Sequence, residues 1–72
     1  MNSTPNYYVG IHQKIEAMDV ISDFGLCYNL GTAVTYLLRA GKKPDNPIEQ
    51  DIRKAIAHLE AELKYLEKFM QI

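Results

Sequence analysis

Residues 46–70 read NPIEQDIRKAIAHLEAELKYLEKFM, and this stretch decides the fold. Asn46 suits the N-cap of a helix, Pro47 its first position and Glu49 the acid of a capping box. Large apolar residues then recur every three or four positions, at Ile48, Ile52, Ile56, Leu59, Leu63, Leu66 and Met70. This spacing is close to that of a coiled-coil seam, and it predicts one long C-terminal helix.

A second helix is predicted from Cys27 to Ala40. Its apolar face consists of Leu30, Ala33, Val34, Leu37 and Leu38. Gly41 suits the end of this helix because glycine readily adopts a left-handed conformation. Gly31 lies inside the helix, where glycine costs about 1 kcal/mol relative to alanine. A glycine in this place indicates the close approach of another backbone or of a ligand.

A third, shorter helix is predicted near the start of the chain. Apolar residues fall on one helical face between positions 11 and 21, at Ile11, Ile15, Met18 and Ile21. Gly25 is its expected stop, and residues 1–10 are expected to form an irregular arm because Pro5 disfavours helix before it. The sequence therefore predicts one all-α domain over residues 1–72. It contains a short N-terminal helix followed by an antiparallel two-helix hairpin.

The long helix carries more apolar surface than one partner helix can cover. A second stripe runs beside the seam, through Ala55, His58, Tyr65, Phe69 and Ile72. A chain of 72 residues buries only a small core, and its one cysteine, Cys27, excludes an internal disulfide. We therefore expect a homo-oligomer. The expected interface residues are Leu59, Leu63, Tyr65, Leu66, Phe69, Met70 and Ile72.

Five cationic residues gather at one end of the predicted hairpin, although the formal net charge is −1. They are Arg39, Lys42, Lys43, Arg53 and Lys54. Local positive charge in a slightly acidic chain favours a small anion over duplex nucleic acid. Arg39 is the preferred phosphate ligand because its planar guanidinium binds phosphate in bidentate fashion. A solvated turn, with Arg53 and Lys54 paired to Glu49 or Asp51, explains the same residues without a ligand.

Tyrosines supply the second candidate feature. Tyr7, Tyr8 and Tyr36 are candidates for stacking on a nucleotide base, and ordinary half-buried packing is the alternative interpretation. His12, His58 and Cys27 lack the spacing of metal ligands, and the chain has no glycine-rich phosphate loop. We therefore predict no metal, cofactor or catalytic residue.

The expected location is the cytoplasm of a bacterial host. The apolar runs are short and interrupted by charge, which argues against a membrane partner. The first residues lack the basic and apolar regions of a signal peptide.

Four segments resemble a small phage-encoded domain that is described as nucleotide-kinase-like or as of unknown function. They are residues 7–8 (YY), 15–21 (IEAMDVI), 30–43 (LGTAVTYLLRAGKK) and 51–56 (DIRKAI). The resemblance covers residues 6 to about 66 and implies a phage or prophage origin. Asn6 stands where the family has histidine, Thr32 where it has asparagine and Thr35 where it has lysine. Any phosphoryl-transfer activity of the family is therefore expected to be lost here.

Three functions follow from these observations. The first is a non-enzymatic oligomer that binds and sequesters a nucleotide, such as a nucleotide immune signal of the host. The second is a protein-interaction module that inhibits a host enzyme through its C-terminal helix. The third, a nucleotide kinase or its accessory, rests on the family resemblance alone.

Overall fold

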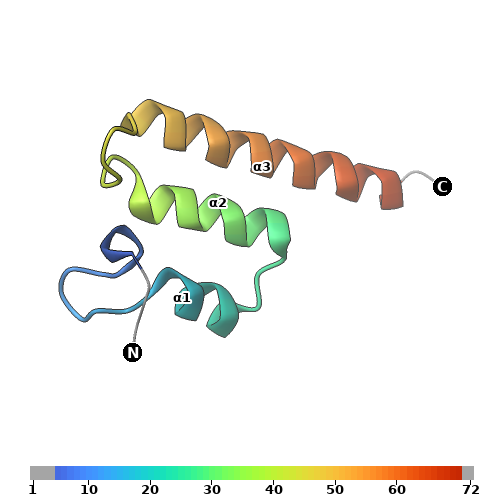
Figure 1. Cartoon of the computed structure of the whole chain (residues 1–72). Helices are drawn as coiled ribbons and strands as arrows, with labels where there is room; N and C mark the ends of the chain where they lie inside the picture. The colour runs from blue at the N-terminus through green and yellow to red at the C-terminus, as the bar shows by residue number, and fades with distance from the viewer. Residues whose placement is uncertain (1–4, 71–72) are drawn as a thin grey trace.

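The chain is all-helical in a computed structural model that describes residues 5–70 (Figure 1). A 3₁₀ turn, η1 (Asn6–Tyr8), precedes three α-helices: α1 (Ala17–Phe24), α2 (Tyr28–Arg39) and α3 (Ile48–Met70). Helix α2 lies between α1 and α3, and η1 packs on α2 as well (Figure 1). The predicted all-α class and the hairpin with a long last helix are confirmed.

Left-handed glycines end the predicted helices. Gly25 has φ 63° directly after α1, and Gly41 has φ 75° two residues after the end of α2. Both positions strongly favour glycine because other L-residues rarely adopt positive φ. Helix α3 begins at Ile48, one residue after the predicted first position Pro47, and the Asn46 side chain donates to Asp51 in its first turn.

Helix α1 begins later than predicted, at Ala17, because residues 10–16 form a loop instead of a helical turn. The N–H of Gly10 donates to the carbonyl of Ile15 at 2.8 Å, next to a β-bridge between Val9 and Glu16. Lys14 has φ 59°, which a right-handed helix excludes. The reciprocal capping box of Glu16 and Asp19 starts α1. The N-terminal arm also differs from the prediction, since residues 6–8 form η1.

Small residues fill the contacts between the helices. The apolar residues that are buried among residues 5–70 are all alanines: Ala17, Ala33 and Ala55. Gly31 faces Ile21 of α1, and a Cβ at Gly31 would lie 2.9 Å from the Ile21 Cγ2 methyl. The close approach predicted at Gly31 is therefore a helix contact. Close packing of small residues leaves most large apolar side chains at the surface.

No helix within residues 5–70 is long and apolar enough to cross a membrane. This agrees with the charge that interrupts each apolar run of the sequence.

Replacing Gly31 with alanine tests the contact between α1 and α2. Alanine gains about 1 kcal/mol of helix propensity, whereas overpacking costs typically 1–3 kcal/mol. We expect a net loss of about 1 kcal/mol, seen as a Tm lower by about 4–8 °C in circular dichroism. In an Ile21→Leu background, which removes the Cγ2 methyl, Gly31→Ala is expected to lose this penalty. A higher Tm for Gly31→Ala alone would contradict the contact.

Candidate functional site

A buried ion pair joins the two helices of the hairpin. Arg39 ends α2 and is 5% exposed, and Asp51 in the first turn of α3 is fully buried. The Nε and Nη2 atoms of Arg39 donate to Asp51 Oδ1 at 3.2 and 3.1 Å. The Asp51 carboxylate also accepts from the Asn46 amide at 2.8 Å and from the Gly41 N–H at 3.4 Å. One carboxylate therefore holds the end of α2, the turn and the start of α3.

The same guanidinium fastens the N-terminal arm. Its Nη1 atom donates to the hydroxyl of Tyr8 at 2.8 Å. The Cζ atom of Arg39 lies 4.7 Å from the ring centre of Tyr36. It lies 5.9 and 5.8 Å from the ring centres of Tyr7 and Tyr8. Aromatic faces attract cations, most strongly where water is excluded. Arg39 is thus enclosed by three tyrosines and one carboxylate.

Arg39 and its partners set the protonation of the Asp51 carboxyl. Burial by itself raises the pKa of Asp51, because the charged form is penalised in a low dielectric. The hydrogen bonds and the positive charge of Arg39, together with the donations from Gly41 and Asn46, outweigh burial. They hold the pKa of Asp51 below its ordinary value, so Asp51 is a carboxylate at neutral pH.

The interpretation of Arg39 as the main phosphate ligand is therefore corrected. Its Nε, Nη1 and Nη2 atoms already donate within the chain, and burial removes it from a ligand in solution. Tyr8 and Tyr36 share this structural role. Tyr36 also stacks on His58 at 5.9 Å and lies beneath the Lys54 ammonium at 5.5 Å, which places it between α2 and α3.

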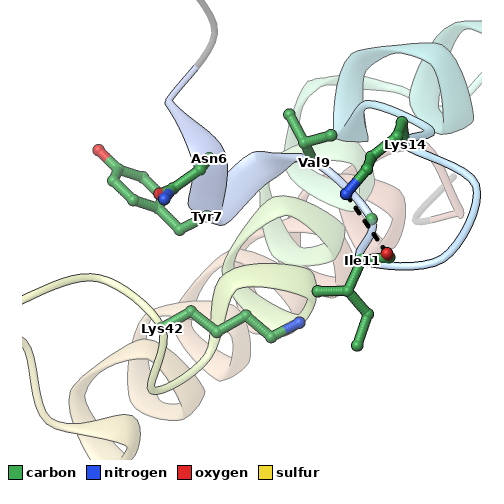
Figure 2. A pocket seen from close by; sticks show the side chains of 7 residues that line it. Asn6, Tyr7, Val9, Ile11, Lys14 and Lys42 are labelled. Atoms are coloured by element: carbon green, nitrogen blue, oxygen red, sulfur yellow. Dashed lines mark hydrogen bonds between the residues drawn. The ribbon is translucent and has the colours of Figure 1, made fainter.

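A pocket of about 390 Å³ lies beside the N-terminal arm (Figure 2). It brings together two residues that the sequence analysis selected, Tyr7 for stacking and Lys42 for phosphate. Lys14, which the sequence analysis did not select, also lines this pocket, as does Asn6. Figure 2 shows Lys42 reaching from the end of α2 beneath Tyr7 toward the loop that carries Ile11.

The ammonium group of each pocket lysine donates a hydrogen bond to a main-chain carbonyl. Lys42 Nζ donates to the carbonyl of Leu38 at 3.1 Å, and Lys14 Nζ donates to that of Ile11 at 3.4 Å. A carbonyl is neutral, and among residues 5–70 neither ammonium group forms an ion pair with a carboxylate. The left-handed backbone of Lys14 belongs to the same loop, and only the folded loop turns this side chain over the pocket.

A second hollow of about 210 Å³ adjoins the pocket and shares Tyr7 and Lys42 with it. Its other lining is mainly apolar and includes Ile15, Val20 and Leu38. An aromatic ring, two cations and an apolar floor therefore meet around Tyr7. Such a combination suits a ligand with one flat apolar part and one anionic part.

The other predicted cations do not line this pocket. Lys43 Nζ is 6.0 Å from the ring centre of Tyr7, on the side of the arm. Lys54 lies over Tyr36, and Arg53 lines a shallow hollow on α3 with Glu49. The structure therefore divides the predicted cluster into a group near Tyr7 and a group on α3.

A polar cluster that the sequence analysis missed connects the other end of α2 to α3. The amide oxygen of Asn29 accepts from Nδ1 of His58 at 3.0 Å, and the Asn29 amide donates to Glu62 Oε1 at 3.3 Å. The ring of Tyr28 meets His58 edge-on at 5.8 Å. His58 thus has a structural environment within the hairpin.

The predicted interface residues of α3 are exposed in the single chain. Leu59, Leu63, Leu66 and Met70 line its seam, and the rings of Tyr65 and Phe69 meet edge-on at 4.8 Å. Ile72 lies outside the described residues. The predicted homo-oligomer stays a prediction here.

Among residues 5–70, no group of three or more histidine, cysteine, aspartate or glutamate side chains is placed to hold a metal ion. Comparison with protein-family models, with curated proteins and with solved structures gave no significant match. The resemblance to the phage domain therefore stays a prediction.

Replacing Asp51 with asparagine leaves Arg39 buried without its counter-charge, which is strongly destabilising. Because folding lowers the pKa of Asp51, its contribution to stability is complete above the ordinary value, about pH 4. The contribution is lost as the pH falls through the lowered pKa. The difference in Tm between wild type and Asp51→Asn is therefore expected to shrink in acid. Asp45→Asn, an exposed change in the same turn, is the control, and a difference independent of pH would contradict the ion pair.

Proposed function

We propose that this chain binds a nucleotide-like anion in the pocket lined by Tyr7, Lys14 and Lys42, and that it does so without chemical conversion. The observation that carries the proposal is the meeting, around about 390 Å³, of one aromatic ring and two ammonium groups that form no ion pair among residues 5–70. This volume lies within the range of small-molecule sites, about 300–1,000 Å³. The net charge of −1 supports a discrete anion over a polyanion.

The two hollows suit two different parts of such a ligand. The apolar hollow with Ile15, Val20 and Leu38 suits a base, and Tyr7, which lines both hollows, offers a stacking surface. Lys14 and Lys42 supply positive charge for the phosphates. Stacking of a base on an aromatic side chain is worth about 1–3 kcal/mol.

A binder that sequesters its ligand needs affinity and many copies but no catalytic group. Asn6 lines the pocket where the phage domain that the chain resembles has histidine. An asparagine keeps a polar contact but loses the acid–base chemistry of an imidazole. This change supports sequestration, such as that of a host nucleotide immune signal, over phosphoryl transfer. A homo-oligomer would carry one such pocket in each subunit.

Tyr7→Ala and Lys42→Ala test the pocket. We expect Tyr7→Ala to weaken binding by about 5- to 150-fold, the equivalent of one lost stacking contact. Tyr7→Phe keeps the ring and is expected to retain most of the affinity. Lys42→Ala is expected to weaken triphosphates more than monophosphates, because it removes charge at the phosphate end. Isothermal titration calorimetry with mono-, di- and triphosphates and cyclic dinucleotides measures these effects.

Lys68→Ala is the matched control, since it removes the same charge from the far end of α3. Mass spectrometry of compounds released from heat-denatured protein, after exposure to a bacterial extract, identifies the ligand class independently. Unchanged affinity in both Tyr7→Ala and Lys42→Ala would disprove the proposed site. Protein that captures no nucleotide from extracts of uninfected or defence-activated cells would contradict nucleotide binding itself.

A further inference from the structure

The most regular apolar surface of the chain is not used within the chain. The seven seam residues of α3, from Ile48 to Met70, are each between 40 and 78% exposed. Helix α2 instead covers a different stripe of α3, which includes Asp51, Ala55, His58 and Glu62. A heptad-like seam of seven large apolar residues is therefore left without a partner.

Helix α2 presents apolar residues on the same side of the hairpin. At about 100° per residue, the seam lies about 80° around α3 from the stripe that faces α2. Leu30 and Leu37 lie about 100° around α2 from Asn29 and Tyr36, which face α3. Because α2 and α3 run antiparallel, the seam of α3 and the two leucines of α2 lie on the same side of the hairpin. Leu30 and Leu37, at 37 and 52% exposure, extend the apolar face of the seam across the hairpin.

The total accessible surface of the chain is larger than that of a compact monomer of the same mass. The chain exposes 5777 Å², whereas a folded monomer of 8.2 kDa is expected to expose about 4,500 Å². A stable protein interface removes about 800 Å² from each partner. The excess of about 1,200 Å² is enough for an interface of this size, and the apolar residues buried among residues 5–70 are alanines.

We propose that a second copy of the chain covers this face, with the two α3 helices packed antiparallel about a two-fold axis near Glu60. Antiparallel seams interleave so that Leu59 meets Leu63 of the partner subunit. The next layer pairs Ile56 with Leu66 of the partner subunit, and the outer layer pairs Ile52 with the partner's Met70. Each layer occurs twice, because a two-fold interface is self-complementary.

The charges beside the seam select the antiparallel direction. Arg53 and Glu67 flank the seam on the same side, two heptads apart. Antiparallel pairing places Arg53 next to Glu67 of the partner subunit at both ends. Glu60 on this flank and Glu62 on the other flank each meet their own symmetry mate. Parallel pairing would instead place Glu62 next to the partner's Glu67 twice and create no opposite-charge pair.

This arrangement also covers part of a second exposed patch. Tyr65 and Phe69 continue the stripe that faces α2, but α2 ends near Glu62 and leaves both rings exposed. In the antiparallel register, the partner's α2 lies alongside residues 60–70 of α3. Phe69, about 90° around α3 from the seam on the side of α2, then packs on Leu37 of the partner subunit. Tyr65 lies about 130° from the seam and stays outside this contact. One symmetry operation therefore covers the seam of α3 together with Leu30, Leu37 and Phe69.

Sedimentation equilibrium tests the pairing. We expect wild type to be a dimer at micromolar concentration and Leu63→Glu to be a monomer, because the change places two charges in the central layers. Lys68→Glu, on the side of α3 opposite the seam, is the control and is expected to remain a dimer. A wild-type protein that is monomeric at tens of micromolar would overturn the proposal. Binding of a foreign protein to the seam would not rescue it.

Charge reversal tests the direction without altering the apolar layers, in case Leu63→Glu fails to fold. Arg53→Glu and Glu67→Arg are each expected to raise the dimer dissociation constant roughly tenfold or more. The double variant is expected to restore it, because each reversed charge again faces its opposite. Within one α3 the two residues are roughly 21 Å apart, so rescue must come from the partner. Additive weakening in the double variant would overturn the antiparallel pairing.

The pairing surface contains none of the residues that line the nucleotide pocket, so the two proposals fail separately. A dimer that binds no nucleotide contradicts only the pocket. A folded wild-type monomer that binds nucleotide contradicts only the pairing.

Discussion

The rest of the structure depends on the buried ion pair between Arg39 and Asp51. A buried charge that loses its partner is strongly unfavourable, so any other alignment of α2 against α3 that leaves either group buried alone is excluded. The pair therefore fixes the register of the hairpin, which the alanines at the helix contact define only weakly. It also orders the turn, because the same carboxylate accepts from Gly41 and Asn46.

Arg39 extends this order to the beginning of the chain. Tyr8 accepts a hydrogen bond from the guanidinium and becomes part of the framework, whereas its neighbour Tyr7 lines the pocket. Two adjacent tyrosines thus have different roles, because successive side chains leave the backbone in different directions. By anchoring Tyr8, the ion pair also determines where Tyr7 stands relative to Lys42. The candidate binding site is therefore built on the element that holds the helices together.

The helices of this chain bury small residues between them and leave large apolar residues exposed. Gly31, Ala33 and Ala55 let the helices approach closely, and the fully buried apolar positions among residues 5–70 are alanines. The large apolar residues consequently lie on the outer side of the hairpin. For a chain of this size, burial between subunits is the available means of removing that surface from water. The small intramolecular core and the proposed dimer have one cause, which is that small residues lie between the helices and large apolar residues lie outside them.

The sequence by itself determined the helices, because the apolar period, Pro47, Gly25 and Gly41 act within a few residues of the chain. It also identified the close contact at Gly31 and selected Tyr7 and Lys42, which share a pocket. The sequence did not determine the start of α1, since the loop that ends at Glu16 depends on pairing with Val9. Only the tertiary structure decided which cations are free. Arg39 and Lys42 are three residues apart in one basic segment, but Asp51 is brought to Arg39 by the folding of the hairpin. Burial and ion pairing depend on residues that are distant in the sequence, so the local sequence pattern does not predict them.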